Sequence, residues 1–222
     1  MLRNIDLSTE SDGRFYTNND MAKTDCGGCR GCSSCCHGMG NSIILDPYDV
    51  CQLTNGLQKS VQDLLVDSVE LNVADGIILP NLKMNGAKED CGFLDQHGRC
   101  SIHTFRPGIC RLFPLGRYYE DHSFKYFIQT NECPYPDKGK TKIKKWLGIP
   151  NLKEYEHFIA EWHYFLKPLQ EFAMTSRDTA AVKQLSMYIL QTFFLTPYNG
   201  PDSFYEEFYG RLSSAKKALS LE

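Results

Sequence analysis

The sequence has no long apolar run and no strong excess of charge of either sign. Its longest apolar stretch, near Met187–Leu190, is soon interrupted by Gln191 and Thr192, whereas a membrane-spanning helix needs roughly 18 such residues. The net charge of −3 provides no general attraction to nucleic acid. We therefore expect a protein that neither enters a membrane nor binds nucleic acid.

A secretory leader is also missing, because the first ten residues are polar and contain no apolar segment. The sequence thus predicts a cytoplasmic protein, and thiols in that compartment stay reduced. We interpret the ten cysteines as metal-binding or redox-active side chains rather than as a disulfide framework.

Five of these cysteines lie between Cys26 and Cys36, with glycine and serine in the gaps. Cysteines two residues apart can direct their sulfur atoms to one point, as tetrahedral thiolate sites require. The small residues allow the backbone to take positive φ and to approach an ion or cluster closely. Cys35 and Cys36 are adjacent, and in an extended chain their side chains would face two different sites.

Further cysteines follow in three separate segments. The stretch from Cys91 to Cys100 has turn residues at its centre, and we expect a hairpin that brings the two thiols to one ion. Cys110 comes after an Arg-Pro pair. Cys133 precedes a proline, and a Cys-Pro pair recurs where a remote cysteine completes an iron–sulfur site.

Two arginines flank Cys110. Four thiolates on Zn²⁺ or on an oxidised four-iron cluster leave an excess of negative charge, which guanidinium groups can offset. Arg106 and Arg111 are therefore candidates for tuning the cofactor from beside its ligands, and surface ion pairing is the alternative. Cys51 is interpreted as a buried apolar thiol, and His97 and His122 as turn residues.

The fold class expected from these patterns is α+β and mainly helical. Residues 1–25 are predicted to be a flexible lead-in, residues 26–137 an irregular metal-binding half with short hairpins, and residues 138–222 a helical subdomain. One helix is expected from Pro47, after Asp46 as its cap, to about Gly56. A second is expected after Ser60, where Ser60 and Asp63 have the form of a capping box, with Val69 and Leu71 on its apolar side. Strands are expected over residues 76–79, before Pro80, and over residues 115–119 and 124–129.

The last segment begins with a run of lysines between Lys138 and Lys145, interpreted as the solvated face of a helix that Gly148 and Pro150 end. From Asn151 onward, apolar and aromatic residues recur at helical spacing and predict three long helices, the third with a capping box at Ser203 and Glu206. We interpret their aromatic stripes as core, and the alternative is a groove for a protein partner.

Taken together, the cysteine motifs resemble the CxxCxxCC family of metal-chelating cysteine-cluster proteins, which includes the flagellin lysine N-methylases. The resemblance covers about residues 26–136. It rests on Cys29-x2-Cys32-x2-Cys35-Cys36, Asp46-Pro47-Tyr48-Asp49-Val50, Cys91-x-Phe93-Leu94 with Gly98-Arg99-Cys100, Arg106-Pro107-x2-Cys110-Arg111-x-Phe113-Pro114, and Cys133-Pro134.

The resemblance implies eight metal ligands: Cys29, Cys32, Cys35, Cys36, Cys91, Cys100, Cys110 and Cys133. They would form two four-thiolate sites, or one cluster with additional thiols beside it. Cys26 is an extra cysteine that gives the spacing of a bacterial ferredoxin loop, although His37 stands where that loop has proline. The partition of ligands stays open.

Three functions follow as hypotheses. The first is an intracellular metal-binding protein, with an iron–sulfur cluster of the 4Fe–4S type favoured over Zn²⁺ and a redox role or an accessory role in protein modification. The second is an enzyme similar to the protein-lysine N-methyltransferases, although the sequence lacks a glycine-rich nucleotide loop after a strand. The third is a structural zinc module whose helical tail binds a protein partner.

Overall fold

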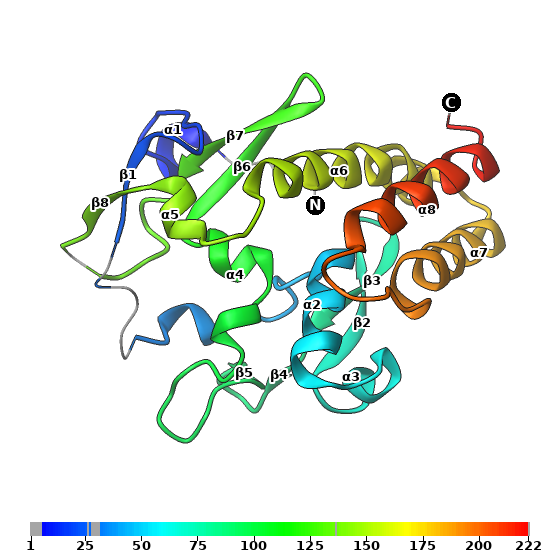
Figure 1. Ribbon diagram of the computed structural model, residues 1–222. Helices are drawn as coiled ribbons and strands as arrows, with labels where there is room; N and C mark the ends of the chain where they lie inside the picture. The colour runs from blue at the N-terminus through cyan, green and yellow to red at the C-terminus, as the bar shows by residue number, and fades with distance from the viewer. Residues whose placement is uncertain (1–5, 26, 28–31, 136, 222) are drawn as a thin grey trace.

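The computed structural model describes residues 6–25, 27, 32–135 and 137–221. Over these residues the fold is α+β and mainly helical, with four separate two-stranded antiparallel sheets (Figure 1). The helices are α1 (Leu7–Glu10), α2 (Pro47–Leu57), α3 (Val61–Asp67), α4 (Gly108–Leu112), α5 (Ile143–Leu147), α6 (Leu152–Thr175), α7 (Thr179–Leu190) and α8 (Phe204–Ala218). The strands are β1 (Met21–Asp25), β2 (Val69–Ala74), β3 (Ile77–Leu82), β4 (Met84–Asn85), β5 (Asp90–Cys91), β6 (Leu115–Glu120), β7 (Ser123–Ile128) and β8 (Gly139–Lys142).

Helices α2 and α3 begin where the sequence predicts. The Asp46 carboxylate accepts a hydrogen bond from the backbone N–H of Asp49, and the Asp49 carboxylate accepts one from the backbone N–H of Asp46. Ser60 and Asp63 form the same reciprocal box at the start of α3. Each box satisfies two backbone donors that a helix start leaves without partners.

Helix α3 is shorter than expected. It ends at Asp67, so Val69 and Leu71, which we had placed on its apolar side, belong to strand β2. From Val69 to Val73 apolar and polar residues alternate, and this period of two favours a strand. The strand expected before Pro80 instead continues to Leu82, with Pro80 opposite Leu71.

The hairpin of β6 and β7 confirms the two strands predicted around a polar turn. Asp121 and His122 both have positive φ, +48° and +55°. Two consecutive left-handed residues make the tight turn whose twist matches that of antiparallel strands.

Only the end of the lysine run forms the predicted solvated helix face, since Lys144 and Lys145 are exposed on α5, whereas the part before it is a strand. Lys140 and Lys142 lie in β8, which pairs antiparallel with β1 from the segment predicted to be a flexible lead-in. Tyr16 also exchanges backbone hydrogen bonds with Tyr126 of β7. Because these partners are more than a hundred residues apart, no local pattern indicates the pairing. Helix α5 then ends at Gly148 as predicted, in the left-handed conformation that glycine favours.

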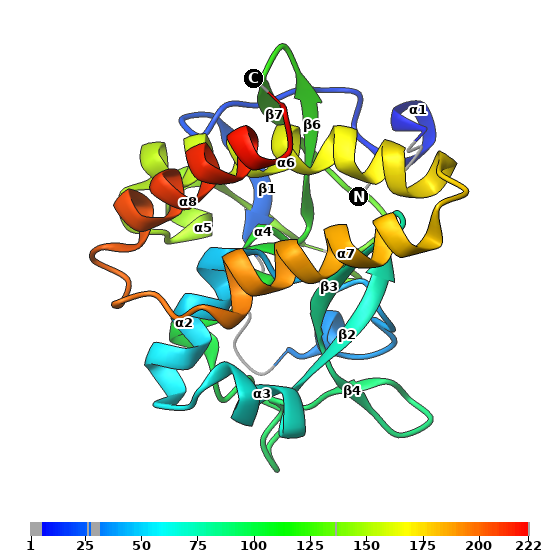
Figure 2. The same ribbon diagram turned by 90° about the vertical axis from the view of Figure 1, so that its right-hand side faces the viewer.

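The C-terminal helices α6, α7 and α8 lie together and carry much of the core. Phe158, Phe193 and Phe208 are completely buried where these helices meet. Helix α7 packs across strand β3, so the helical region and the cysteine-bearing half share one hydrophobic core (Figure 2). The capping box expected at Ser203 does not form, because the Ser203 hydroxyl donates to the Glu207 carboxylate instead.

No helix in the described part of the chain has the length and apolar character needed to span a membrane.

Candidate metal centre

Six cysteines from separate segments line one cavity of about 290 Å³, which we call the thiol cavity. They are Cys32, Cys35, Cys36, Cys91, Cys100 and Cys110. The wall is completed by cationic side chains, including Arg99 and Arg106, and by apolar ones, including Phe113 and Trp146. The chain therefore brings together in space most of the thiols that the sequence singled out.

The N-terminal thiols are carried by a short 3₁₀ turn, Ser34–Cys36. The turn is closed by the Cys36 N–H, which donates to the Ser33 carbonyl at 2.7 Å. Because this backbone is turned rather than extended, Cys35 and Cys36 do not face opposite sides as predicted. Both line the thiol cavity, with their sulfur atoms 4.0 Å apart.

The hairpin predicted between Cys91 and Cys100 is present as a short antiparallel turn, in which the Asp95 N–H donates to the Arg99 carbonyl and the Ser101 N–H donates to the Phe93 carbonyl. Cys91 lies in β5 and pairs with Met84 of β4, while Cys100 forms an isolated bridge with Leu94. The Asp95 carboxylate accepts hydrogen bonds from the backbone N–H groups of His97 and Arg99 and so fixes the turn between the two cysteines. His97 is exposed at this turn, as expected.

Cys110 lies on α4, which is anchored to the core. The Asp49 carboxylate of α2 accepts a hydrogen bond from the Gly108 N–H at 2.7 Å. A Cβ on Gly108 would overlap the Tyr155 hydroxyl, so only glycine lets α4 approach α6 this closely. The start of α4, and with it Cys110, is thus held by two helices of the core.

The two arginines have different places. Arg106 lines the thiol cavity and contacts His103, and its buried Nε has no hydrogen-bond partner among the residues that the structure describes. Arg111 lies in a neighbouring pocket and donates to the backbone carbonyls of Thr104, Arg106 and Gly148. Arg106 is therefore placed beside the thiols, whereas Arg111 braces the chain that carries them.

The thiols of the cavity resist simultaneous ionisation. Burial, followed by the charges of nearby acidic groups, raises the pKa of Cys110, and burial likewise raises the pKa of Cys91 and Cys100. A hydrogen bond from Cys36 lowers the pKa of Cys35 to about 6 and raises the pKa of Cys36. Crowded thiols that repel one another as thiolates are stabilised when a metal cation supplies the opposite charge.

No disulfide involves any of the eight cysteines within the described ranges. Among the same residues, no three His, Cys, Asp or Glu side chains close around one point as the ligands of a single ion would. The predicted ligands Cys26 and Cys29 lie outside the described residues. Cys133 is buried but does not line the thiol cavity, so its role as a ligand stays a prediction.

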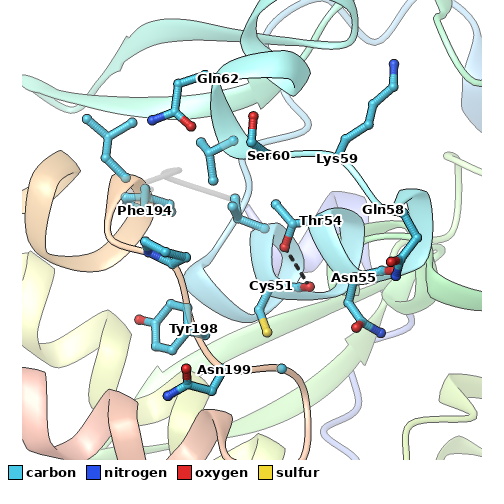
Figure 3. Close-up of a pocket in the computed structure, with 15 residues that line it drawn as sticks. Cys51, Thr54, Asn55, Gln58, Lys59, Ser60, Gln62, Phe194, Tyr198 and Asn199 are labelled. Carbon is cyan, nitrogen blue, oxygen red and sulfur yellow. Dashed lines mark hydrogen bonds between the residues drawn. The ribbon is translucent and has the colours of Figure 1, made fainter.

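Cys51 belongs to a different pocket, of about 400 Å³, between α2 and the segment after α7. Its thiol points toward Tyr198 and Asn199 (Figure 3). The residue is 3% exposed, and burial raises the pKa of its thiol to about 12. The interpretation of Cys51 as a buried, unreactive thiol agrees with these observations.

Sequence reasoning missed two features of the site. Trp146 from α5 lies on the cavity wall, where its indole N–H donates to the Phe113 carbonyl. His37 and Asp90 pair beside the cavity through a contact of 2.6 Å. Neither feature has a local signal, because each joins segments that are distant in the chain.

A comparison with protein families finds one match. Residues 28–135 match the CxxCxxCC family model, which is described as a "putative zinc- or iron-chelating domain". Neither the curated proteins nor the solved structures provide a match to this chain.

Proposed function

We propose that this chain, which belongs to the CxxCxxCC family through residues 28–135, binds an iron–sulfur cluster by the thiolates of its thiol cavity. The family establishes a cysteine-cluster domain for zinc or iron. The cluster, its 4Fe–4S type and a redox role are our proposal.

The observation that carries the proposal is the gathering of six thiols around one cavity. Thiolates are soft ligands that select zinc, copper(I) and iron–sulfur clusters over hard cations. No carboxylate of the described chain lines this cavity, so calcium or magnesium would find few of the oxygen ligands they require.

The size of the cavity and its cations favour a cluster over one zinc ion. About 290 Å³ is far more than the ~10–15 Å³ that a single water molecule needs, so the cavity has room for a group larger than one ion. Four thiolates on an oxidised four-iron cluster leave excess negative charge, which Arg106 and Arg99 are placed to offset. The cluster would supply one-electron chemistry, and the apolar wall would limit access of water to it.

The test is purification without oxygen, followed by analysis of iron, acid-labile sulfide and zinc. We expect brown protein with a visible absorption band and a paramagnetic resonance signal after reduction. A colourless protein with stoichiometric zinc would overturn the iron–sulfur proposal and leave the family's chelating role intact.

Two cysteine variants make this test specific. Cys110→Ser removes a thiol from the cavity wall and should lower cluster content. Cys51→Ser removes the buried thiol of the other pocket and should leave cluster content unchanged.

A structural zinc module is the second candidate, because the cysteine-bearing segments have little regular secondary structure of their own. In that case zinc removal would unfold these segments and no reversible reduction would be measured. A protein partner on the helical region belongs to this alternative. A lysine methyltransferase gains no support, since every sheet of the described residues is two-stranded and antiparallel and offers no doubly wound dinucleotide-type site.

A further inference from the structure

Two cysteine-bearing segments run side by side at the edge of the thiol cavity. The Gly38 N–H donates to the carbonyls of Lys88 and Glu89 at 3.1 and 3.2 Å. Gly98 also lies beside this segment, because a Cβ on it would be 3.8 Å from the Ser33 hydroxyl. The segment around Cys36, from Ser33 to Gly38, is therefore in contact with both the turn before Cys91 and the turn before Cys100.

The side chain of His37 connects these segments. Its Nδ1 lies 2.6 Å from Oδ1 of Asp90, and its Nε2 lies 3.1 Å from Oγ of Ser33. A neutral imidazole with its proton on Nδ1 satisfies both contacts, because it donates to the carboxylate and accepts from the hydroxyl. With both ring nitrogens engaged, His37 has none left for a metal.

His37 and Asp90 are each next to a cysteine in the sequence, so their contact can position those two cysteines. His37 directly follows Cys36, and Asp90 directly precedes Cys91. The hydrogen bond between them therefore fixes how far apart the two cysteine backbones can move.

We propose that His37 is a positioning residue, which holds Cys36 and Cys91 on adjoining walls of the thiol cavity so that both bind the same metal centre. This inference rests on the proposed metal-binding function. It also assigns two cysteines from distant segments to one site, which the spacing of cysteines in the sequence cannot do.

The contact should act on metal binding rather than on the fold as a whole. His37 and Asp90 are 43% and 40% exposed, and exposed pairs contribute little to global stability. Without the contact, however, the metal itself must order the two segments as it binds, and that ordering weakens affinity. Contacts that orient ligands from behind typically change metal affinity by about 10- to 100-fold when removed.

The test compares variants of the full chain by titration with Co²⁺ and Zn²⁺ against a competing chelator. His37→Ala and Asp90→Ala should each weaken affinity by about 10-fold. The double variant should lose little more than either single one, because both changes remove the same contact. His37→Asn keeps a donor near the Nδ1 position and should recover most of the affinity.

His97→Ala is the matched control, since His97 is an exposed histidine on a nearby turn that contacts neither Ser33 nor Asp90. It should bind Co²⁺ like the unchanged protein. The thiolate-to-cobalt absorption band provides a second measurement, and it should weaken in His37→Ala and recover in His37→Asn.

The outcomes separate the inference from the function on which it rests. If the unchanged protein binds Co²⁺ with a thiolate band and His37→Ala binds it equally well, His37 has no positioning role although the metal site stands. If the protein purified without oxygen contains no iron, sulfide or zinc, and the unchanged protein binds neither Co²⁺ nor Zn²⁺ in the titration, the proposed function fails and this inference fails with it. Circular dichroism of each variant checks folding, and Asp90→Ala tests the same contact should His37→Ala not fold.

Discussion

The thiol cavity and the C-terminal helices are built in different ways. The helices α6, α7 and α8 bury aromatic side chains completely, and Phe158, Phe193 and Phe208 leave no surface to water. The cavity walls come mostly from turns, from the two-residue strand β5 and from the five-residue helices α4 and α5. Five of their six cysteines are partly buried, and Cys32 is exposed. One region is held by apolar contact along long helices, whereas the other brings polarizable, ionisable groups together with little regular structure.

This difference indicates where a metal matters. Apolar burial stabilises the helical region without any cofactor. Crowded thiols gain most of their favourable energy only when a cation holds them as thiolates. We therefore expect changes to metal and changes to core to affect the two regions separately.

Removal of metal should have the largest effect. Structural thiolate sites can contribute apparent stabilisation on the order of 10 kcal/mol, so chelation should loosen the cysteine-bearing segments. Hydrogen exchange followed by mass spectrometry should show faster exchange over residues 32–36, 86–100 and 106–112. Helices α6 and α8 should keep their protection, and an equal loss in both regions would contradict the comparison.

A core substitution should produce the reverse pattern. Phe208→Ala removes a fully buried ring and should lower the free energy of unfolding by about 3–5 kcal/mol. Metal content per folded molecule should stay unchanged. Phe172→Ala, at a phenylalanine that is 46% exposed, is the control and should change stability by less than about 0.5 kcal/mol. Denaturant unfolding measures the free energy of unfolding of both variants. Loss of metal from folded Phe208→Ala would contradict the expectation that core and metal site respond separately.

Gly108→Ala tests the contact between the two regions. The added Cβ would overlap the Tyr155 hydroxyl and push α4 away from α6, at a cost of about 1–3 kcal/mol. Because α4 carries Cys110, metal affinity should fall as well. Gly210→Ala is the matched control, since nothing lies within 4 Å of its added Cβ in α8. It should leave metal affinity unchanged, which competition with a chelator would show.

The smallest effect is expected at the end of α2. Gln58 has a φ of +52°, a conformation that glycine adopts without steric cost. Gln58→Gly should therefore raise the free energy of unfolding by about 0.5 kcal/mol, after the loss of the Gln58 hydrogen bond to Asn55 is included. Thermal unfolding should show a slightly higher melting temperature for Gln58→Gly. A lower melting temperature would show that the lost hydrogen bond outweighs the relief of backbone strain.

Local sequence signals predicted the elements whose causes are local. Asp46 before Pro47 and Ser60 before Asp63 located two helix starts, because the capping contacts span only three residues. Asp121 and His122 marked a turn between two alternating strands. The pairing of β1 with β8 and the bridge of Cys91 to Met84 were missed, because each depends on a partner that the local pattern does not contain.

The sequence by itself determined that this chain is rich in cysteines spaced for metal binding, and that its C-terminal part is helical with an aromatic core. Spacing of cysteines and periodicity of apolar residues are properties of the chain, so they can be found without coordinates. Only the tertiary structure decided that Cys35 and Cys36 share a cavity, that Arg106 lies beside it while Arg111 does not, and that His37 meets Asp90. Such contacts depend on how distant segments pack against a common core, and the distance between two side chains in space does not follow from their distance along the sequence.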